Sequence, residues 1–163
     1  MKRLLALGLT AAVLAATPRS YAQEYLLGAS ASISSGAEGG SVGLYRARTR
    51  LRLGTDLRVD EFPDDILEIG LLAELEPRSA FGADVRYAHA AGKHFVVDVG
   101  ALGILAPLSL YGVCASLTYR IPMSKTVQIT LGPEGDFYFL GTDLPDGTVI
   151  WEMRFQGGLR VEL

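Results

Sequence analysis

Apolar and polar residues alternate with a period of two along almost the whole chain after residue 22. This alternation is typical of β-strands with one apolar and one polar face, and no useful length of chain after residue 22 follows the 3.6-residue period of a helix. Clusters of Gly, Pro, Asp and Ser, which favour turns, separate the alternating stretches. The pattern predicts one all-β domain with eight antiparallel strands at residues 25–34, 42–53, 66–76, 81–90, 94–105, 108–121, 126–140 and 148–163.

Charged residues within these eight segments occupy only even-numbered positions. The even positions hold eight arginines and nine acidic residues, whereas no odd position holds Asp, Glu, Lys or Arg. Because successive side chains of a strand point to opposite faces, the predicted sheet has one uncharged face and one highly charged face.

Two kinds of barrel fit this pattern. A soluble barrel would turn its apolar face inward, whereas a membrane barrel turns that face toward lipid and its polar face toward the lumen. The charged face carries no lysine, since Lys93 and Lys125 both lie in predicted turns, and small residues such as Gly70 and Ser116 lie among the charges. The interior of an eight-stranded barrel is just wide enough to be filled by side chains, and Arg suits enclosed pairing with carboxylates. These features favour a closed, transmembrane, up-and-down β-barrel with a charged lumen.

The predicted lumen network contains charges of both signs in near balance. A hairpin centred near residue 60 would set Arg52 beside Glu68 and Arg46 beside Glu74 in a single register. In a closed lumen such pairing is obligatory because an unpartnered buried charge is costly, whereas the alternative, a solvated ladder of ion pairs, stabilises little. The residues assigned to the network are Arg46, Arg48, Arg50, Arg52, Glu68, Glu74, Glu76, Asp84, Arg86, Arg120, Glu134, Asp136, Glu152 and Arg154.

Aromatic residues on the uncharged face gather toward the ends of the predicted strands. Rings at both edges of an apolar band form the interfacial girdles of membrane barrels, and scattered core aromatics are the alternative. Predicted strand lengths of about 10–14 residues suit a tilted crossing of the hydrocarbon layer. The predicted girdle consists of Tyr25, Tyr45, Phe81, Tyr87, Phe95, Tyr111, Tyr119, Phe139 and Trp151.

Residues 1–22 have the features of a secretory signal peptide. Lys2 and Arg3 precede an uncharged run over residues 4–16, and Ser20 and Ala22 supply the small residues that a signal peptidase requires. The run is too short for a helix that spans a bilayer, although a retained anchor is the alternative. We therefore expect an exported protein with one mature domain over residues 23–163.

Charge and cysteine content narrow the function classes. Removal of residues 1–22 leaves 12 basic residues against 18 acidic ones, a formal charge of −6, which argues against binding to nucleic acid. Cys114 is the single cysteine, so no internal disulfide can form.

The chain resembles the small eight-stranded outer-membrane proteins of the OmpA and OmpX type over residues 23–163. The resemblance implies a bacterial outer-membrane location, contact with the lipid bilayer, and recognition of the C-terminal strand by the outer-membrane assembly machinery. Leu163 departs from the usual aromatic last residue, and the longest predicted connection (54–65) falls on the periplasmic side, where this family has short turns. The resemblance also depends on the terminal pattern Phe155, Gly157, Leu159, Val161 and Leu163.

No catalytic residues, cofactor or metal site are expected. His89 and His94 flank one turn but have no third ligand at a regular spacing. The serines at 30–35 lie far along the chain from both histidines, so no activated nucleophile is evident. Cys114 is expected to be a packed side chain. An acidic connection could attract Ca²⁺ but lacks the ligand spacing of a dedicated loop; it holds Asp56, Asp60, Glu61, Asp64 and Asp65.

The sequence thus favours a non-enzymatic outer-membrane barrel with a plugged, charge-paired lumen that serves envelope integrity or surface interaction. Three alternatives stay open: a narrow pore, a soluble periplasmic barrel that binds a hydrophobic ligand, and a lipid-modifying enzyme.

Overall fold

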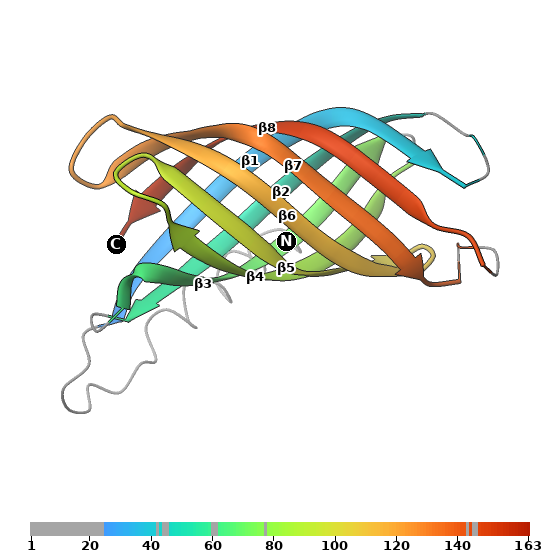
Figure 1. The fold of residues 1–163 in the computed structure, drawn as a ribbon, viewed down its shortest axis with the longest axis horizontal. Helices are drawn as coiled ribbons and strands as arrows, with labels where there is room; N and C mark the ends of the chain where they lie inside the picture. Colours follow the sequence, from blue (N-terminus) through green and yellow to red (C-terminus); the bar gives the residue numbers. More distant parts are fainter. Residues whose placement is uncertain are drawn as a thin grey trace, which may run out of the picture.

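The structure, a computed structural model, describes residues 25–41, 43, 46–59, 62–76, 78–142, 144 and 147–163. The predicted signal peptide lies outside these residues. Among the described residues, no helix is long and apolar enough to cross a membrane. Eight strands make up the fold (Figure 1): β1 (Tyr25–Gly40), β2 (Arg46–Val59), β3 (Phe62–Glu76), β4 (Ala80–Ala90), β5 (Phe95–Ala106), β6 (Leu110–Pro122), β7 (Val127–Leu140) and β8 (Ile150–Glu162).

Each strand pairs antiparallel with the next along the chain, and β1 also pairs with β8. The sheet is therefore a closed barrel with no open edge on which another chain could add a strand. The prediction of an eight-stranded, antiparallel, up-and-down barrel is confirmed.

The two ends of the barrel carry different parts of the chain. The described N-terminal start of β1 and the C-terminus lie at one end (Figure 1), which we call the terminal end; the connections after β2, β4 and β6 also lie there. The turn after β4 closes through a 2.8 Å hydrogen bond from the Ala91 amide to the Phe95 carbonyl, and Gly92 supplies the positive φ of 89° that this turn requires. We call the opposite end the loop end.

The hairpin between β2 and β3 corrects the predicted 54–65 connection. β2 extends to Val59 and β3 begins at Phe62, because the two-residue alternation continues through Asp56, which is buried, and Leu57, which is exposed. The longest connection between strands is instead the one between β7 and β8, over residues 141–149 at the loop end. The longest connection therefore does not lie at the end that holds the termini, and the predicted difference from the outer-membrane family in the position of this connection is wrong.

The apolar face of the sheet points outward. Leu53 and Leu71 are 62% and 68% exposed, whereas Arg50 and Glu152 are 2% and 1% exposed. A barrel with an apolar interior, which the sequence left open as the soluble alternative, does not form.

The lumen also contains two apolar clusters that the charge pattern did not predict. The larger one lies at the loop end and includes Leu72, Leu102, Ile104 and Leu110, with the buried ring of Tyr138. The smaller one lies at the terminal end and consists of Ile66, Ala88 and Val96. Charged and apolar side chains therefore share the lumen toward both ends, since Leu72 lies opposite Arg52 and Ile66 lies opposite Arg58.

Candidate functional site

The candidate site is the set of charged side chains inside the barrel, to which all eight strands contribute. β2 supplies three of the cations, Arg48, Arg50 and Arg52, and all three are buried. They alternate with Thr49 and Leu51, which point outward. The two-residue period of the strand thus places three guanidinium groups in one row along the lumen.

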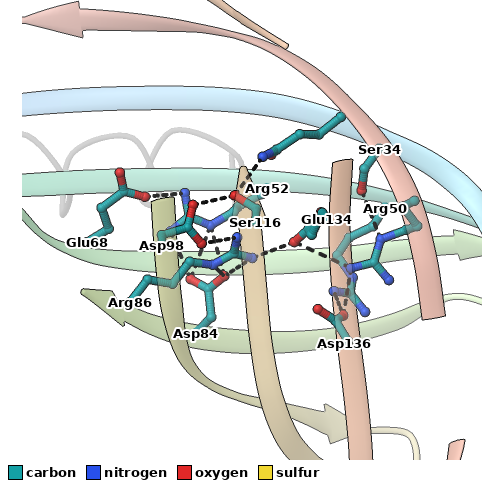
Figure 2. Close-up of polar contacts among 12 residues, drawn as sticks. Ser34, Arg50, Arg52, Glu68, Asp84, Arg86, Asp98, Ser116, Glu134 and Asp136 are labelled. Atoms are coloured by element: carbon teal, nitrogen blue, oxygen red, sulfur yellow. Dashed lines mark hydrogen bonds and ion pairs between the residues drawn. The ribbon is translucent and has the colours of Figure 1, made fainter. Parts of the chain in front are cut away.

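Arg50 lies at the centre of the loop-end half of the network. Its Nη1 donates to Asp136 at 2.5 Å, and its Nη2 donates to Glu74 at 2.6 Å. Nη2 also lies 2.6 Å from the Tyr138 hydroxyl and 3.1 Å from Glu152. One guanidinium therefore binds groups from β3, β7 and β8, and Figure 2 shows Arg50 beside Asp136.

Arg48 and Arg154 complete this half of the network. Arg48 contacts Glu38 and donates to Glu74 at 2.6 Å. Arg154 contacts Glu152 and donates to Asp136 at 2.6 Å and to the Ser34 hydroxyl at 3.1 Å. Three carboxylates, those of Glu74, Asp136 and Glu152, each pair with two or more arginines. The guanidinium groups of Arg48, Arg50 and Arg154 are therefore joined through shared carboxylates.

Arg52 and Arg86 occupy the middle of the lumen and share Asp84 (Figure 2). Arg52 Nε lies 2.9 Å from Asp84 Oδ2, and Arg86 Nη2 lies 2.7 Å from the same oxygen. Arg52 also pairs with Glu68 at 3.1 Å. Arg86 reaches across the barrel from β4 to Glu134 of β7 at 2.6 Å, so the network joins strands that are not neighbours in the sheet.

Two glycines make room for Arg52. Gly54 and Gly70 lie opposite each other in the β2–β3 pair. A Cβ on Gly70 would lie 2.2 Å from Asp84 Oδ1 and 2.7 Å from Arg52 Nε, and a Cβ on Gly54 would lie 2.9 Å from Arg52 Nη1. Any larger residue at Gly70 would collide with the Arg52–Asp84 pair.

The structure places most of the predicted network residues together but corrects two of them. Arg46 and Glu76 are exposed. Glu76 leaves the lumen because a register shift between Thr49 and Arg50 sets it opposite Thr49, whose side chain lies on the outward side of β2. A shift of this kind, a β-bulge, changes the face that the following residues occupy.

The predicted register of the β2–β3 hairpin is also wrong. Arg50, rather than Arg46, lies opposite Glu74, and Asp56, rather than Arg52, lies opposite Glu68. Between Arg50 and Arg58 the pairing is displaced by four residues from the predicted register, and because four is an even number the side chains there keep their predicted faces. Arg52 still reaches Glu68 along the diagonal.

The charge pattern missed several residues of the network. Glu38 and Asp56 lie in segments that were predicted as connections, yet both are buried in the lumen. Tyr138 has the even parity of the lumen face, and this parity was the available signal. Asp98 and Arg160 share that parity and are also buried, although neither was assigned to the network. Arg120, which was assigned, is half-buried near the terminal end.

The predicted girdle residues point outward in two groups. Tyr87, Phe95 and Tyr119 lie toward the terminal end, where the rings of Phe95 and Tyr119 are 5.1 Å apart. The loop end carries the second group. Tyr45 and the side chain of Tyr25 lie outside the described part of the structure. The loop-end group consists of Phe81, Tyr111, Phe139 and Trp151, all exposed.

The remaining candidate groups are held by local contacts. His89 Nδ1 and the Tyr87 hydroxyl both lie 2.7 Å from Asp65 Oδ1 on the outer surface. His94 Nδ1 instead lies 3.2 Å from the Arg120 carbonyl, so the two histidines have different partners. Cys114 is buried in the loop-end apolar cluster. Within the described ranges, no group of three or more His, Cys, Asp or Glu side chains is placed to hold a metal ion.

Closure by eight strands gives the chain the fold of the small eight-stranded outer-membrane barrels, so the resemblance predicted from the sequence is confirmed at the level of fold. The crystal structure of Neisserial surface protein A has this fold, with a TM-score of 0.53 and 12% identity over 88% of this chain and 100% of that chain. The solid-state NMR structure of outer membrane protein AlkL in DMPC lipid bilayers has a TM-score of 0.46 and 9% identity over 90% of this chain and 95% of that chain. A de novo designed transmembrane β-barrel has a TM-score of 0.44 and 9% identity over 82% of this chain and 95% of that chain. No protein-family model and no curated protein sequence matches the chain.

Proposed function

We propose that the protein is a non-enzymatic β-barrel of a bacterial outer membrane, with a lumen closed by paired charges and a role in envelope integrity or surface interaction. The observation that carries this proposal is the arrangement of the two faces. Apolar side chains such as Leu53 and Leu71 cover the outside, whereas Arg50 and Glu152 are enclosed.

The outer surface suits lipid better than water. Monomeric soluble proteins rarely expose a continuous apolar patch larger than a few hundred Å², yet here every strand presents its apolar face outward. Strands of 11 to 16 residues are long enough to cross the hydrocarbon layer at a tilt, and closure of the sheet pairs the backbone groups that lipid cannot. The two groups of outward aromatic rings match the two interfaces of a bilayer.

The lumen contents favour a plug over an open channel. Arg50 and Arg86 each bind carboxylates from three or more directions and thereby cross-link opposite walls. At the loop end, the apolar cluster around Leu72 and Leu102 adds a second obstruction. An eight-stranded barrel offers an interior that side chains can fill completely.

The proposed partners follow from the same surface. The lipid bilayer would contact the outward face, and the outer-membrane assembly machinery would recognise the C-terminal strand β8. β8 presents the exposed side chains of Phe155 and Leu159 on that face. A role in envelope integrity or surface interaction requires no catalytic group. The buried charged side chains pair with one another, which agrees with such a role.

Membrane association has a direct test. We expect the mature protein to stay in the membrane pellet after osmotic shock and to require detergent for extraction. In unheated gel samples it should migrate differently from the boiled protein, because a closed barrel resists unfolding by detergent. Release into the osmotic-shock fluid without detergent would show that the outward face meets water and would exclude the proposal.

The plug is tested by electrical recording. Reconstituted into planar bilayers, the native protein should give no steady ionic current, with an established porin as the positive control in the same membranes. The physical reason is that Arg50 and Arg86 bridge the lumen walls. Stepwise conductance that disappears when Arg48, Arg50 and Arg52 are neutralised would instead identify a narrow pore.

A further inference from the structure

The lumen has a cavity on its terminal side. Its volume is about 40 Å³, enough for a few water molecules, since one water needs roughly 10–15 Å³ by the same measure. Most of its lining residues are polar, and they include Ser30, Arg52, Glu68, Asp98, Arg120 and Arg160. A polar cavity of this size in a charged lumen raises the question of its contents.

The cations that line the cavity outnumber the anions. Four arginines face two carboxylates, Glu68 and Asp98, and both carboxylates are occupied. Glu68 pairs with Arg52 at 3.1 Å, and Asp98 pairs with Arg86 at 3.3 Å. Within the described part of the chain, the remaining two arginines of the lining, Arg120 and Arg160, form no ion pair with either carboxylate of the cavity wall.

Arg120 has no ion pair within 4 Å among the described residues, and its buried Nε has no hydrogen-bond partner. Arg160 is 4% exposed, and its Nε lies 2.8 Å from Asp56 Oδ2 without the alignment of a hydrogen bond. Its Nη1 is buried and lacks any partner. The hydroxyl of Ser30, which lies opposite Arg160 in the β1–β8 pair, is buried and unpartnered as well.

We infer that this cavity is an anion site that holds one chloride-sized inorganic anion between Arg120, Arg160 and Ser30. Three unsatisfied donors from β1, β6 and β8 line one small space, and two of them carry positive charge. Leaving such donors buried without an acceptor is costly, and guanidinium and hydroxyl groups are good anion donors. The inference needs the closed lumen but not the membrane setting.

Thermal unfolding of the native protein in detergent tests the site. Sodium chloride is compared with sodium gluconate at equal ionic strength, because gluconate is too large for the cavity. We expect a midpoint higher in chloride by on the order of 3 °C, since an anion that binds only the folded state stabilises it. Bromide should act like chloride. Equal midpoints in chloride and gluconate would overturn the inference.

Two matched variants locate the effect. Arg120→Gln should abolish the difference between chloride and gluconate, and in gluconate it should unfold at a higher temperature than the native protein because it removes an uncompensated charge. Lys125→Gln removes one positive charge from an exposed turn at the same end and should keep the full difference. A full difference in Arg120→Gln would place the anion elsewhere and overturn the site.

A measurement on the native protein makes the test independent of whether Arg120→Gln folds. Exchange of chloride with an enclosed site broadens the ³⁵Cl NMR line of the bulk ion. We expect broadening in proportion to protein concentration that bromide reverses and gluconate does not. Absence of protein-dependent broadening would overturn the inference.

Discussion

Replacement of Arg50 by alanine should lower the free energy of unfolding by about 3–5 kcal/mol, the usual cost of removing one partner from a buried ion pair. Arg50 binds Asp136, Glu74 and Glu152 at 2.5, 2.6 and 3.1 Å, and its loss would leave three buried carboxylates close together. Like charges held in a closed lumen repel, and water cannot enter freely to solvate them. Urea unfolding in lipid vesicles, followed by the fluorescence of Trp151, would measure the change.

Two variants control this experiment. Arg46→Ala removes the same kind of side chain from the same strand at an exposed position, and its effect should stay within about 0.5 kcal/mol. Arg50→Lys keeps the charge but loses the planar fork that reaches several carboxylates, so its cost should fall between the other two. If Arg50→Ala cost no more than Arg46→Ala, the charges of the lumen would not be enclosed.

Leu71→Arg should destabilise the protein in lipid vesicles by about 2–4 kcal/mol, the cost of arginine on the lipid face near the bilayer midplane. Leu71 is 68% exposed and lies on β3 between the levels of the two aromatic groups, with Phe81 opposite Ala73 and Tyr87 opposite Leu67. The same urea unfolding in vesicles would report the loss. In a protein surrounded by water, arginine at so exposed a position would cost little.

Leu75→Arg is the matched control for Leu71→Arg. Leu75 lies on the same strand and is exposed, but it lies beyond the level of Phe81 near the end of β3. There arginine can reach the interface, so we expect a cost of about 0–1 kcal/mol. Equal and small costs at the two positions would contradict a lipid-facing surface.

The sequence predicted part of the lumen network. The parity of Arg48, Arg50 and Arg52 correctly indicated that the three side chains share one face. It did not indicate that Arg50 would meet Asp136, which lies five strands further along the chain. The bulge near Thr49 also removed Glu76 from the lumen, and nothing in the alternation marks that position.

By itself the sequence determined the number of strands and the composition of each face. These properties are local, because each residue's face follows from its position in its own strand and the alternation repeats eight times. Even the shifted hairpin kept its faces around Arg50 and Asp56, since the pairing there moved by four residues, an even number, from the predicted register.

Only the tertiary structure decided which charges meet. The partners of Arg86 come from β4, β5 and β7, and their distances depend on how far each strand slides along the next before the barrel closes. The bulges and the lack of a hydrogen-bond partner for Arg120 Nε among the described residues follow from the same global geometry. The alternation along one strand carries no information about distances across the lumen. Those distances are set only when the barrel closes.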